Sequence, residues 1–122
     1  MTLLPGPARP ADSRTDRECR MDVSVTPTKT GALVTVRGEI DLDTATDLRT
    51  ALLHVVTACD EPGTGVALDL SQVSFCDSTG LNTLLRARLH ALDERQNLTI
   101  AHASPAVTRL LEITGSAHLF RP

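Results

Sequence analysis

Residues 66–92 read VALDLSQVSFCDSTGLNTLLRARLHAL, and the change of pattern within this stretch decides the fold. The stretch opens with a short, nearly continuous apolar run at 66–70, which predicts a β-strand buried on both faces. After Ser78 the apolar residues recur at helical spacing, and Arg86 and Arg88 stand mostly off that stripe. The stripe consists of Leu81, Leu84, Leu85, Leu89 and Leu92. A buried strand followed by an amphipathic helix is typical of an α/β fold with parallel strands.

The chain before this stretch predicts an antiparallel β-hairpin. Val23 and Val25 alternate with polar neighbours, as in a half-buried strand, and residues 33–36 (LVTV) form a second, β-branched run. Residues 27–31 (PTKTG) supply turn chemistry between the two runs. Gly38 is expected to end the second strand or to occupy a bulge. The hairpin would add an antiparallel edge to a mostly parallel sheet.

A first helix is predicted to begin near Thr44. Thr44 and Asp47, three residues later, resemble a capping box, in which the two side chains satisfy free backbone N–H groups. The apolar residues that follow occur at positions i, i+4, i+7 and i+8, which places them on one face of a helix. They are Leu48, Leu52, Val55 and Val56. Pro62 and Gly63 then break the chain before the buried strand.

After the leucine-rich helix the chain predicts one more strand and one more helix. Residues 97–101 (NLTIA) form a short strand pattern, and Ser104 followed by Pro105 is typical of a helix N-cap with proline at the first helical position. Gly115 is a natural helix stop. Residues 119–120 (LF) are expected to form a last short strand.

These elements predict a single α/β domain at 21–122, with a mixed, mostly parallel β-sheet, an N-terminal antiparallel hairpin and helices packed on the sheet. Residues 1–20 contain three prolines and a mixed-charge stretch with almost no core-forming side chains, so they are predicted to form a disordered N-terminal tail. A chain of 122 residues is long enough for one core and too short for two.

Composition excludes several classes of function. The net charge is −3, and Phe75 and Phe120 are the only aromatic residues, so neither a basic groove nor a stacking platform for nucleic acid is expected. Three cysteines and four histidines show no metal-ligand spacing, so we expect no metal and no cofactor. No apolar run approaches the eighteen or so residues of a membrane span, and the N-terminus lacks a signal pattern, so we expect a cytoplasmic protein without membrane insertion.

Residues 75–81 (FCDSTGL) are the most informative stretch for function. They place Ser78 at the start of a helix, where unpaired backbone N–H groups and the helix dipole favour negative charge, so a phosphate on its hydroxyl would be tolerated. Gly80 lowers helix propensity and is expected to leave the backbone open to an approaching partner. Asp-Ser-Thr before an apolar helix is equally typical of a plain N-cap, and the pattern alone leaves both interpretations open.

Two separate motifs resemble the STAS family. One is CDSTGL at 76–81, preceded by LDLS at 68–71, and the other is GEIDLDTA at 38–45, where the second strand turns into the first helix. The resemblance covers residues 22–121 and is to STAS domains of the anti-sigma factor antagonist type. The family usually closes with a further helix after the last strand. In this chain we expect that helix to be shortened or absent, and with it any partner contact that it makes in the family.

The resemblance implies the site residues. The serine that follows the aspartate is the phosphoacceptor in such proteins, which points to Ser78. The implied partner-binding surface comprises Asp41, Asp77, Ser78, Thr79, Gly80 and Asn82. Asp41 is as readily a structural turn residue, and Cys76 is expected to be a small buried hydrophobe.

The implied function is that of a non-enzymatic partner switch. Unmodified, the protein would bind an anti-sigma factor with serine kinase activity, and phosphorylation of Ser78 would release it until a serine phosphatase restored the free hydroxyl. One alternative is an accessory STAS subunit of a lipid transporter or signalling assembly without sigma control. A serine hydrolase is disfavoured, because Cys76 stands where a nucleophile elbow has its first glycine.

Overall fold

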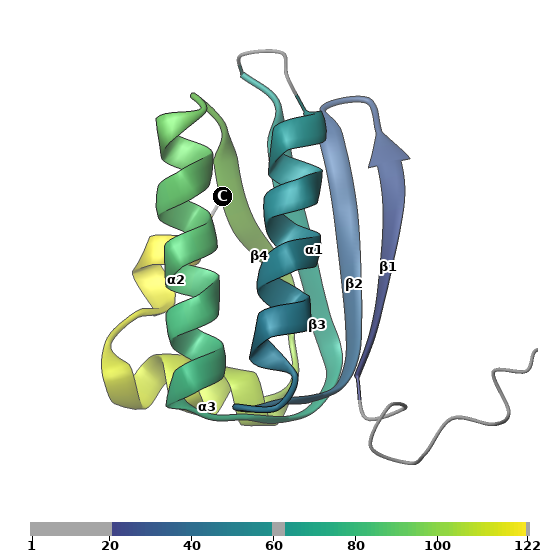
Figure 1. The fold of residues 1–122 in the computed structure, drawn as a ribbon. Coiled ribbons are helices and arrows are strands. Elements are labelled where there is room, and N and C mark those ends of the chain that lie inside the picture. Colours follow the sequence, from purple (N-terminus) through teal and green to yellow (C-terminus); the bar gives the residue numbers. More distant parts are fainter. Residues whose placement is uncertain (1–20, 60–62, 122) are drawn as a thin grey trace, which may run out of the picture.

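The computed structural model describes residues 21–59 and 63–121, which form a four-stranded sheet with helices packed against it. All elements except the last follow one another in the predicted order, and Figure 1 shows their arrangement. They are β1 (Met21–Thr28), β2 (Gly31–Ile40), α1 (Ala45–Ala58), β3 (Gly65–Cys76), α2 (Ser78–Asp93), β4 (Asn97–Ala103), α3 (Pro105–Thr114) and the 3₁₀ helix η2 (Ala117–Phe120). The predicted disordered tail, residues 1–20, lies outside the described residues.

The sheet has the strand order β1-β2-β3-β4, and the predicted mixture of pairings is confirmed. β1 pairs antiparallel with β2, whereas β2 with β3 and β3 with β4 pair in parallel. Gly38 has a positive φ of 99° and lies where the β2–β3 register shifts, so the expected bulge is present. All three parallel strands therefore end at the same edge of the sheet, where the loops into α1, α2 and α3 begin.

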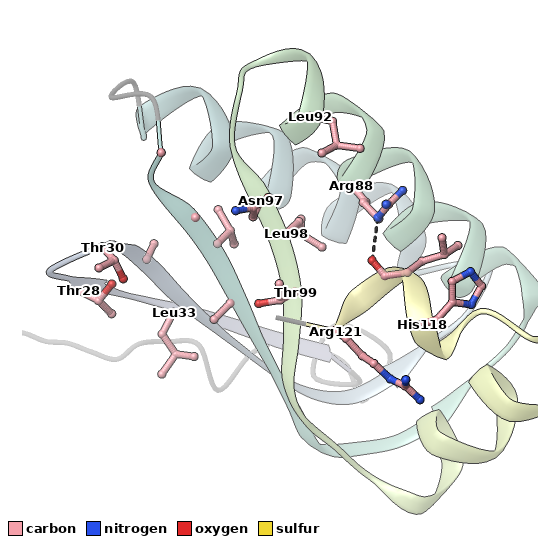
Figure 2. A pocket seen from close by; sticks show the side chains of 16 residues that line it. Thr28, Thr30, Leu33, Arg88, Leu92, Asn97, Leu98, Thr99, His118 and Arg121 are labelled. Atoms are coloured by element: carbon pink, nitrogen blue, oxygen red, sulfur yellow. Dashed lines mark hydrogen bonds between the residues drawn. The ribbon is translucent and has the colours of Figure 1, made fainter.

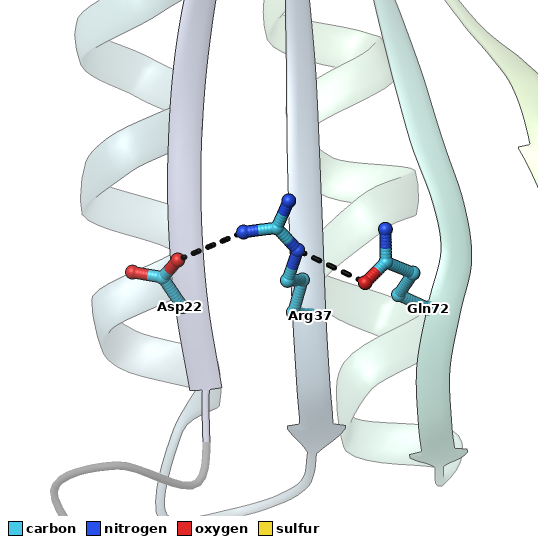
Figure 3. A network of polar contacts seen from close by, with 3 residues as sticks. All are labelled: Asp22, Arg37 and Gln72. Atoms are coloured by element: carbon cyan, nitrogen blue, oxygen red, sulfur yellow. Dashed lines mark hydrogen bonds and ion pairs between the residues drawn. The ribbon is translucent and has the colours of Figure 1, made fainter.

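The helices α1 and α2 lie side by side over one face of the sheet (Figure 1). Strand residues that point toward them are fully buried, among them Val34, Leu68 and Leu70. The opposite face carries a polar contact across three strands (Figure 3): Arg37 donates from Nε to Gln72 Oε1 at 3.0 Å and lies 3.7 Å from the Asp22 carboxylate. Along β3 the buried side chains alternate with more exposed ones, which lie on this opposite face. The expectation that β3 is buried on both faces is therefore wrong.

The face of α2 that enters the core differs from the predicted leucine stripe. Leu81 and Leu84 are buried as predicted, but Leu89 and Leu92 are 57% and 45% exposed. The buried side is completed instead by small residues, Gly80, Ala87 and Ala91. Small side chains permit a close approach of the helix to the sheet and to α1, and this approach turns the larger leucines outward.

The ends of the helices confirm some predictions and overturn two. The Ser104 hydroxyl accepts a hydrogen bond from the Val107 N–H, and Gly115 ends α3 in the left-handed region, both as expected. Thr44 precedes α1 but its side chain makes no capping hydrogen bond, so the predicted capping box is absent. The residues predicted to form a last strand belong instead to the 3₁₀ helix η2, and Phe120 of this helix is buried against the core.

Candidate functional site

The candidate site lies at the edge of the sheet where the parallel strands end, at the bottom of Figure 1. The loop from β2 to α1 and the turn from β3 to α2 meet there, because the Asp77 N–H donates to the Ile40 carbonyl oxygen at 3.2 Å. Residues 37 positions apart in the sequence are thereby joined at one corner of the molecule. Chemistry-bearing loops in α/β proteins are commonly found outside the carboxyl ends of the strands.

Asp77 fixes the start of α2 and thereby the position of Ser78. Its backbone is extended, and its Oδ1 accepts a hydrogen bond from the Gly80 N–H at 3.0 Å, as an N-cap does. Ser78 is therefore the first residue of the helix, and it is exposed. Within the described residues the N–H groups of Ser78 and Thr79 form no backbone hydrogen bond, as expected of a helix N-terminus. The hydroxyl thus stands in solvent beside two available donors and the positive end of the helix dipole.

Gly80 is buried, which corrects the expectation that it leaves the backbone open to a partner. A Cβ at this position would lie 2.6 Å from Ile40 Cγ2, 2.9 Å from Cys76 Sγ and 3.1 Å from the Ile40 carbonyl oxygen. Contacts this short require the neighbours to move. Gly80 therefore lets the first turn of α2 pack against the end of β2, and it supports the position of Ser78 from below.

The β2–α1 loop is held by the side chains of Asp41 and Thr44. Asp41 Oδ1 accepts from the N–H groups of Asp43 and Thr44 at 3.0 and 3.2 Å. Thr44 Oγ1 accepts from the Asp41 N–H at 2.9 Å and donates to the Glu39 carbonyl oxygen at 2.8 Å. These bonds give Asp41 a structural role in the turn, and they explain why Thr44 does not cap α1.

Around Ser78 the predicted partner-binding residues differ in accessibility. Asn82, one turn further along α2, is exposed, whereas Asp41, Asp77 and Thr79 are half-buried. The Thr79 carbonyl oxygen accepts from the Thr83 hydroxyl at 3.0 Å, within the helix. The accessible surface thus includes the exposed Ser78 and Asn82, and Asp41, Asp77 and Thr79 in part.

Two exposed apolar residues at this end of the sheet escaped the sequence analysis. Leu42, in the β2–α1 loop, is 73% exposed, and Phe75, near the end of β3, is 47% exposed. A signal for Phe75 was present, since it directly precedes the buried Cys76 in a strand and alternation turns it to the opposite face. Leu42 stands between two aspartates in a loop, where an apolar side chain has no core to enter.

Two ionisable groups on β3 have shifted pKa values. Burial raises the pKa of the Cys76 thiol to about 11, with a smaller contribution from the charge of Asp77, and Cys76 belongs to the core as predicted. Hydrogen bonds from the side chain and backbone of Ser71 lower the pKa of Asp69, at 2.6 and 3.0 Å to its Oδ1. Asp69 therefore satisfies local donors on β3, and the buried thiol is kept protonated.

A separate depression among the described residues lies elsewhere. It has a volume of about 670 Å³ and is lined by residues near the amino-terminal ends of β3 and β4, by α2 and by the segment around η2 (Figure 2). Among its lining residues are Leu33, Arg88, Leu92, His118 and Arg121. Ser78 is not among them, so this depression is separate from the candidate site. In the described part of the chain no three His, Cys, Asp or Glu side chains are grouped to hold a metal ion.

A mixed four-stranded sheet with two helices on one face, and an exposed serine at the start of α2, define a STAS-type domain. The chain belongs to the family described as "Mlab, STAS domain", which matches residues 23–121. It is 36% identical over 81 residues to an anti-sigma-B factor antagonist of Listeria monocytogenes, covering 66% of this chain and 68% of that protein. The predicted resemblance to STAS domains of the anti-sigma factor antagonist type is thereby confirmed.

Solved structures agree with this assignment. The crystal structure of an anti-sigma factor antagonist from Mycobacterium paratuberculosis is similar with a TM-score of 0.71 and 30% identity, over 82% of each chain. The unphosphorylated form of the anti-sigma factor antagonist SpoIIAA shares the fold, with a TM-score of 0.64 at 18% identity over 80% of this chain and 84% of that one. None of the helices formed by residues 21–59 and 63–121 has the length and apolar character needed to span a membrane.

Proposed function

We propose that this protein is an anti-sigma factor antagonist whose binding is switched off by phosphorylation of Ser78. The observation that carries the proposal is the exposure of Ser78 at the first position of α2, in a chain that is similar to anti-sigma factor antagonists. A kinase can reach a hydroxyl placed there without unfolding the domain. The partner-binding surface comprises Ser78, Asn82 and the accessible parts of Asp41, Asp77 and Thr79, with Gly80 packed beneath them.

The physical basis of the switch is a local change in charge. Phosphorylation adds about −1.5 to −2 charges and three acceptor oxygens at one point. The N–H groups at the start of α2 and the helix dipole stabilise an anion at this position, so the fold itself is expected to change little. A docked protein surface has to bury the same phosphate, and an unpaired buried charge is costly. Unfavourable desolvation and repulsion then act on the complex and not on the free domain.

The proposal defines two partners by their chemistry. The first is an anti-sigma factor with serine kinase activity, which binds the unmodified surface and modifies Ser78, and the second is a serine phosphatase that restores the hydroxyl. Both act in the cytoplasm, where the sigma factor is used. The protein itself performs no catalysis in this scheme and needs neither metal nor cofactor.

The test is affinity capture from the native lysate with three baits: the unmodified chain, Ser78→Asp and the control Ser24→Asp. Ser24 is an exposed serine on β1, so it tests for an effect of added charge elsewhere. We expect the unmodified and Ser24→Asp chains to retain an anti-sigma factor with a kinase domain, and Ser78→Asp to retain much less.

Mass spectrometry of the chain after incubation with that kinase identifies the modified residue. Phosphorylation that persists in Ser78→Ala at the wild-type rate would refute the assignment of the phosphoacceptor. Capture of a transporter ATPase in place of an anti-sigma factor would favour the alternative, an accessory subunit without sigma control.

A further inference from the structure

A row of side chains follows one exposed face of α2 from the phosphoacceptor to the end of the helix. Ser78, Asn82, Leu85, Leu89 and Leu92 are separated by four, three, four and three residues. This spacing places them along one side of a helix, in the pattern by which two helices pair. We call these five residues the α2 seam. Ser78 stands in line with its leucines, about 10 Å from Leu85 along the axis at 1.5 Å per residue.

The leucines of the α2 seam are not required by the core of the domain. Leu89 and Leu92 are 57% and 45% exposed, and Leu85 is only partly buried. The opposite side of α2, with Leu84, Ala87 and Ala91, already fills the contact with the sheet and with α1. Single exposed leucines are ordinary, but a row of them at pairing distance forms a continuous apolar strip.

Charged residues beside the α2 seam define what can bind to it. Arg86 and Arg88 flank its leucines, and the carboxylates of this helix lie only at its two ends, in Asp77 before the first turn and Asp93 as the last residue. The Arg88 Nε donates to the Leu119 carbonyl oxygen at 2.8 Å, which holds this side chain beside the seam, and Figure 2 shows Arg88 and Leu92 on the same helix above the depression. A second copy of α2 would bring two more arginines to the same place, and repulsion opposes such self-pairing.

We propose that the α2 seam is the docking surface for a helix of the protein partner, one that presents an apolar ridge bordered by Asp and Glu. This inference rests on the proposed function and extends the partner's footprint from Ser78 to Leu92. It also explains how one phosphate can act on the whole contact. A phosphate on Ser78 places negative charge at the end of a surface that otherwise attracts an acidic partner, so it weakens both the local contact and the electrostatic attraction along the seam.

The experiment measures the affinity of the purified chain for the purified anti-sigma factor by isothermal titration calorimetry. The test variants are Leu89→Ser, Leu92→Ser and Arg86→Glu. The matched control is Ile113→Ser on α3, because Ile113 is 75% exposed and does not lie on the seam. We expect each leucine variant to weaken binding by about tenfold, as for apolar residues central to an interface.

The control is expected to bind as the wild type does, and Arg86→Glu is expected to weaken binding and reduce its dependence on salt. All four side chains are exposed, so circular dichroism should show unchanged folding.

The outcomes separate this inference from the proposed function. Wild-type affinity in both leucine variants, with weaker binding by Ser78→Asp, would overturn the α2 seam and leave the switch intact. Weaker binding by the leucine variants with full binding by Ser78→Asp would support the seam and refute the switch. If the unphosphorylated wild-type chain were a dimer at the concentrations used and the Leu89→Ser variant a monomer, the seam would be occupied by a second copy, and the inference would be overturned.

Discussion

Replacing Gly80 with alanine is expected to destabilise the domain, although alanine is the better helix former. In an exposed helix interior the change from glycine to alanine stabilises by about 1 kcal/mol. At Gly80 the added Cβ would meet Ile40 Cγ2 at 2.6 Å and Cys76 Sγ at 2.9 Å. Neither atom is the free end of a flexible side chain, because Ile40 is fully buried and Cys76 belongs to the core. Overpacking at such a site costs about 1–3 kcal/mol.

The third contact, with the Ile40 carbonyl oxygen at 3.1 Å, involves backbone that also accepts the Asp77 N–H. If Ile40 moved to relieve the crowding by the added Cβ, the turn before Ser78 would be disturbed. The cost of overpacking should therefore lie in the upper part of its range. With the helix gain subtracted, we expect a net loss of about 1–2 kcal/mol in the free energy of unfolding.

The assay is urea unfolding followed by circular dichroism, since the chain has no Trp or Tyr for fluorescence. A lower midpoint at an unchanged m-value would report lost stability alone. The control Asn82→Ala, at an exposed position on the same helix, should show only the small gain of a better helix former, about 0.5 kcal/mol. In a Cys76→Ala background the cost of Gly80→Ala should shrink, because one of the three crowded atoms is gone. A Gly80→Ala chain that is more stable than wild type would refute the close packing of this turn.

Two further predictions concern the residues on either side of Ser78. Asp77→Ala should lower the free energy of unfolding, measured with urea, by about 1 kcal/mol, because the N-cap hydrogen bond is lost. Asp77→Asn should lose much less, because its side-chain oxygen can still accept that bond. Equal losses in the two variants would contradict the capping role. Because burial raises the Cys76 pKa from 9.0 to about 11, the unfolded chain releases this proton first as the pH rises. The contribution of Cys76 to stability should be complete below pH 9 and fall toward pH 11. A Cys76→Ala chain with the same decline would refute this.

The order of elements was predictable because the local signals agree with the tertiary structure. Ser104 and Pro105 start α3 and Gly115 ends it, since backbone groups at helix ends need these residue types in any context. The antiparallel hairpin and the parallel strands likewise followed from alternation and spacing. Where the chemistry of a position is local, the sequence is sufficient.

The features that could not be predicted depend on contacts between distant segments. The inward face of α2 is set by how closely the helix approaches the sheet, and hydrophobicity alone placed Leu89 and Leu92 in the core. Thr44 has an ordinary capping sequence, but its hydroxyl binds the Glu39 carbonyl oxygen because β2 ends beside it. Gly80 was expected to open the surface, and only the position of Ile40 shows that it closes a contact.

The central claim is that a phosphate on Ser78 is tolerated by the domain and rejected by its partner. The most direct measurement compares the chain carrying phosphoserine at position 78 with the unmodified chain, in both affinity for the anti-sigma factor and thermal unfolding. The account predicts a loss of affinity of about a hundredfold, as for a like-charge contact of a few kcal/mol, with the unfolding temperature nearly unchanged. Equal affinity of the two forms, or a phosphorylated chain that no longer folds, would contradict it.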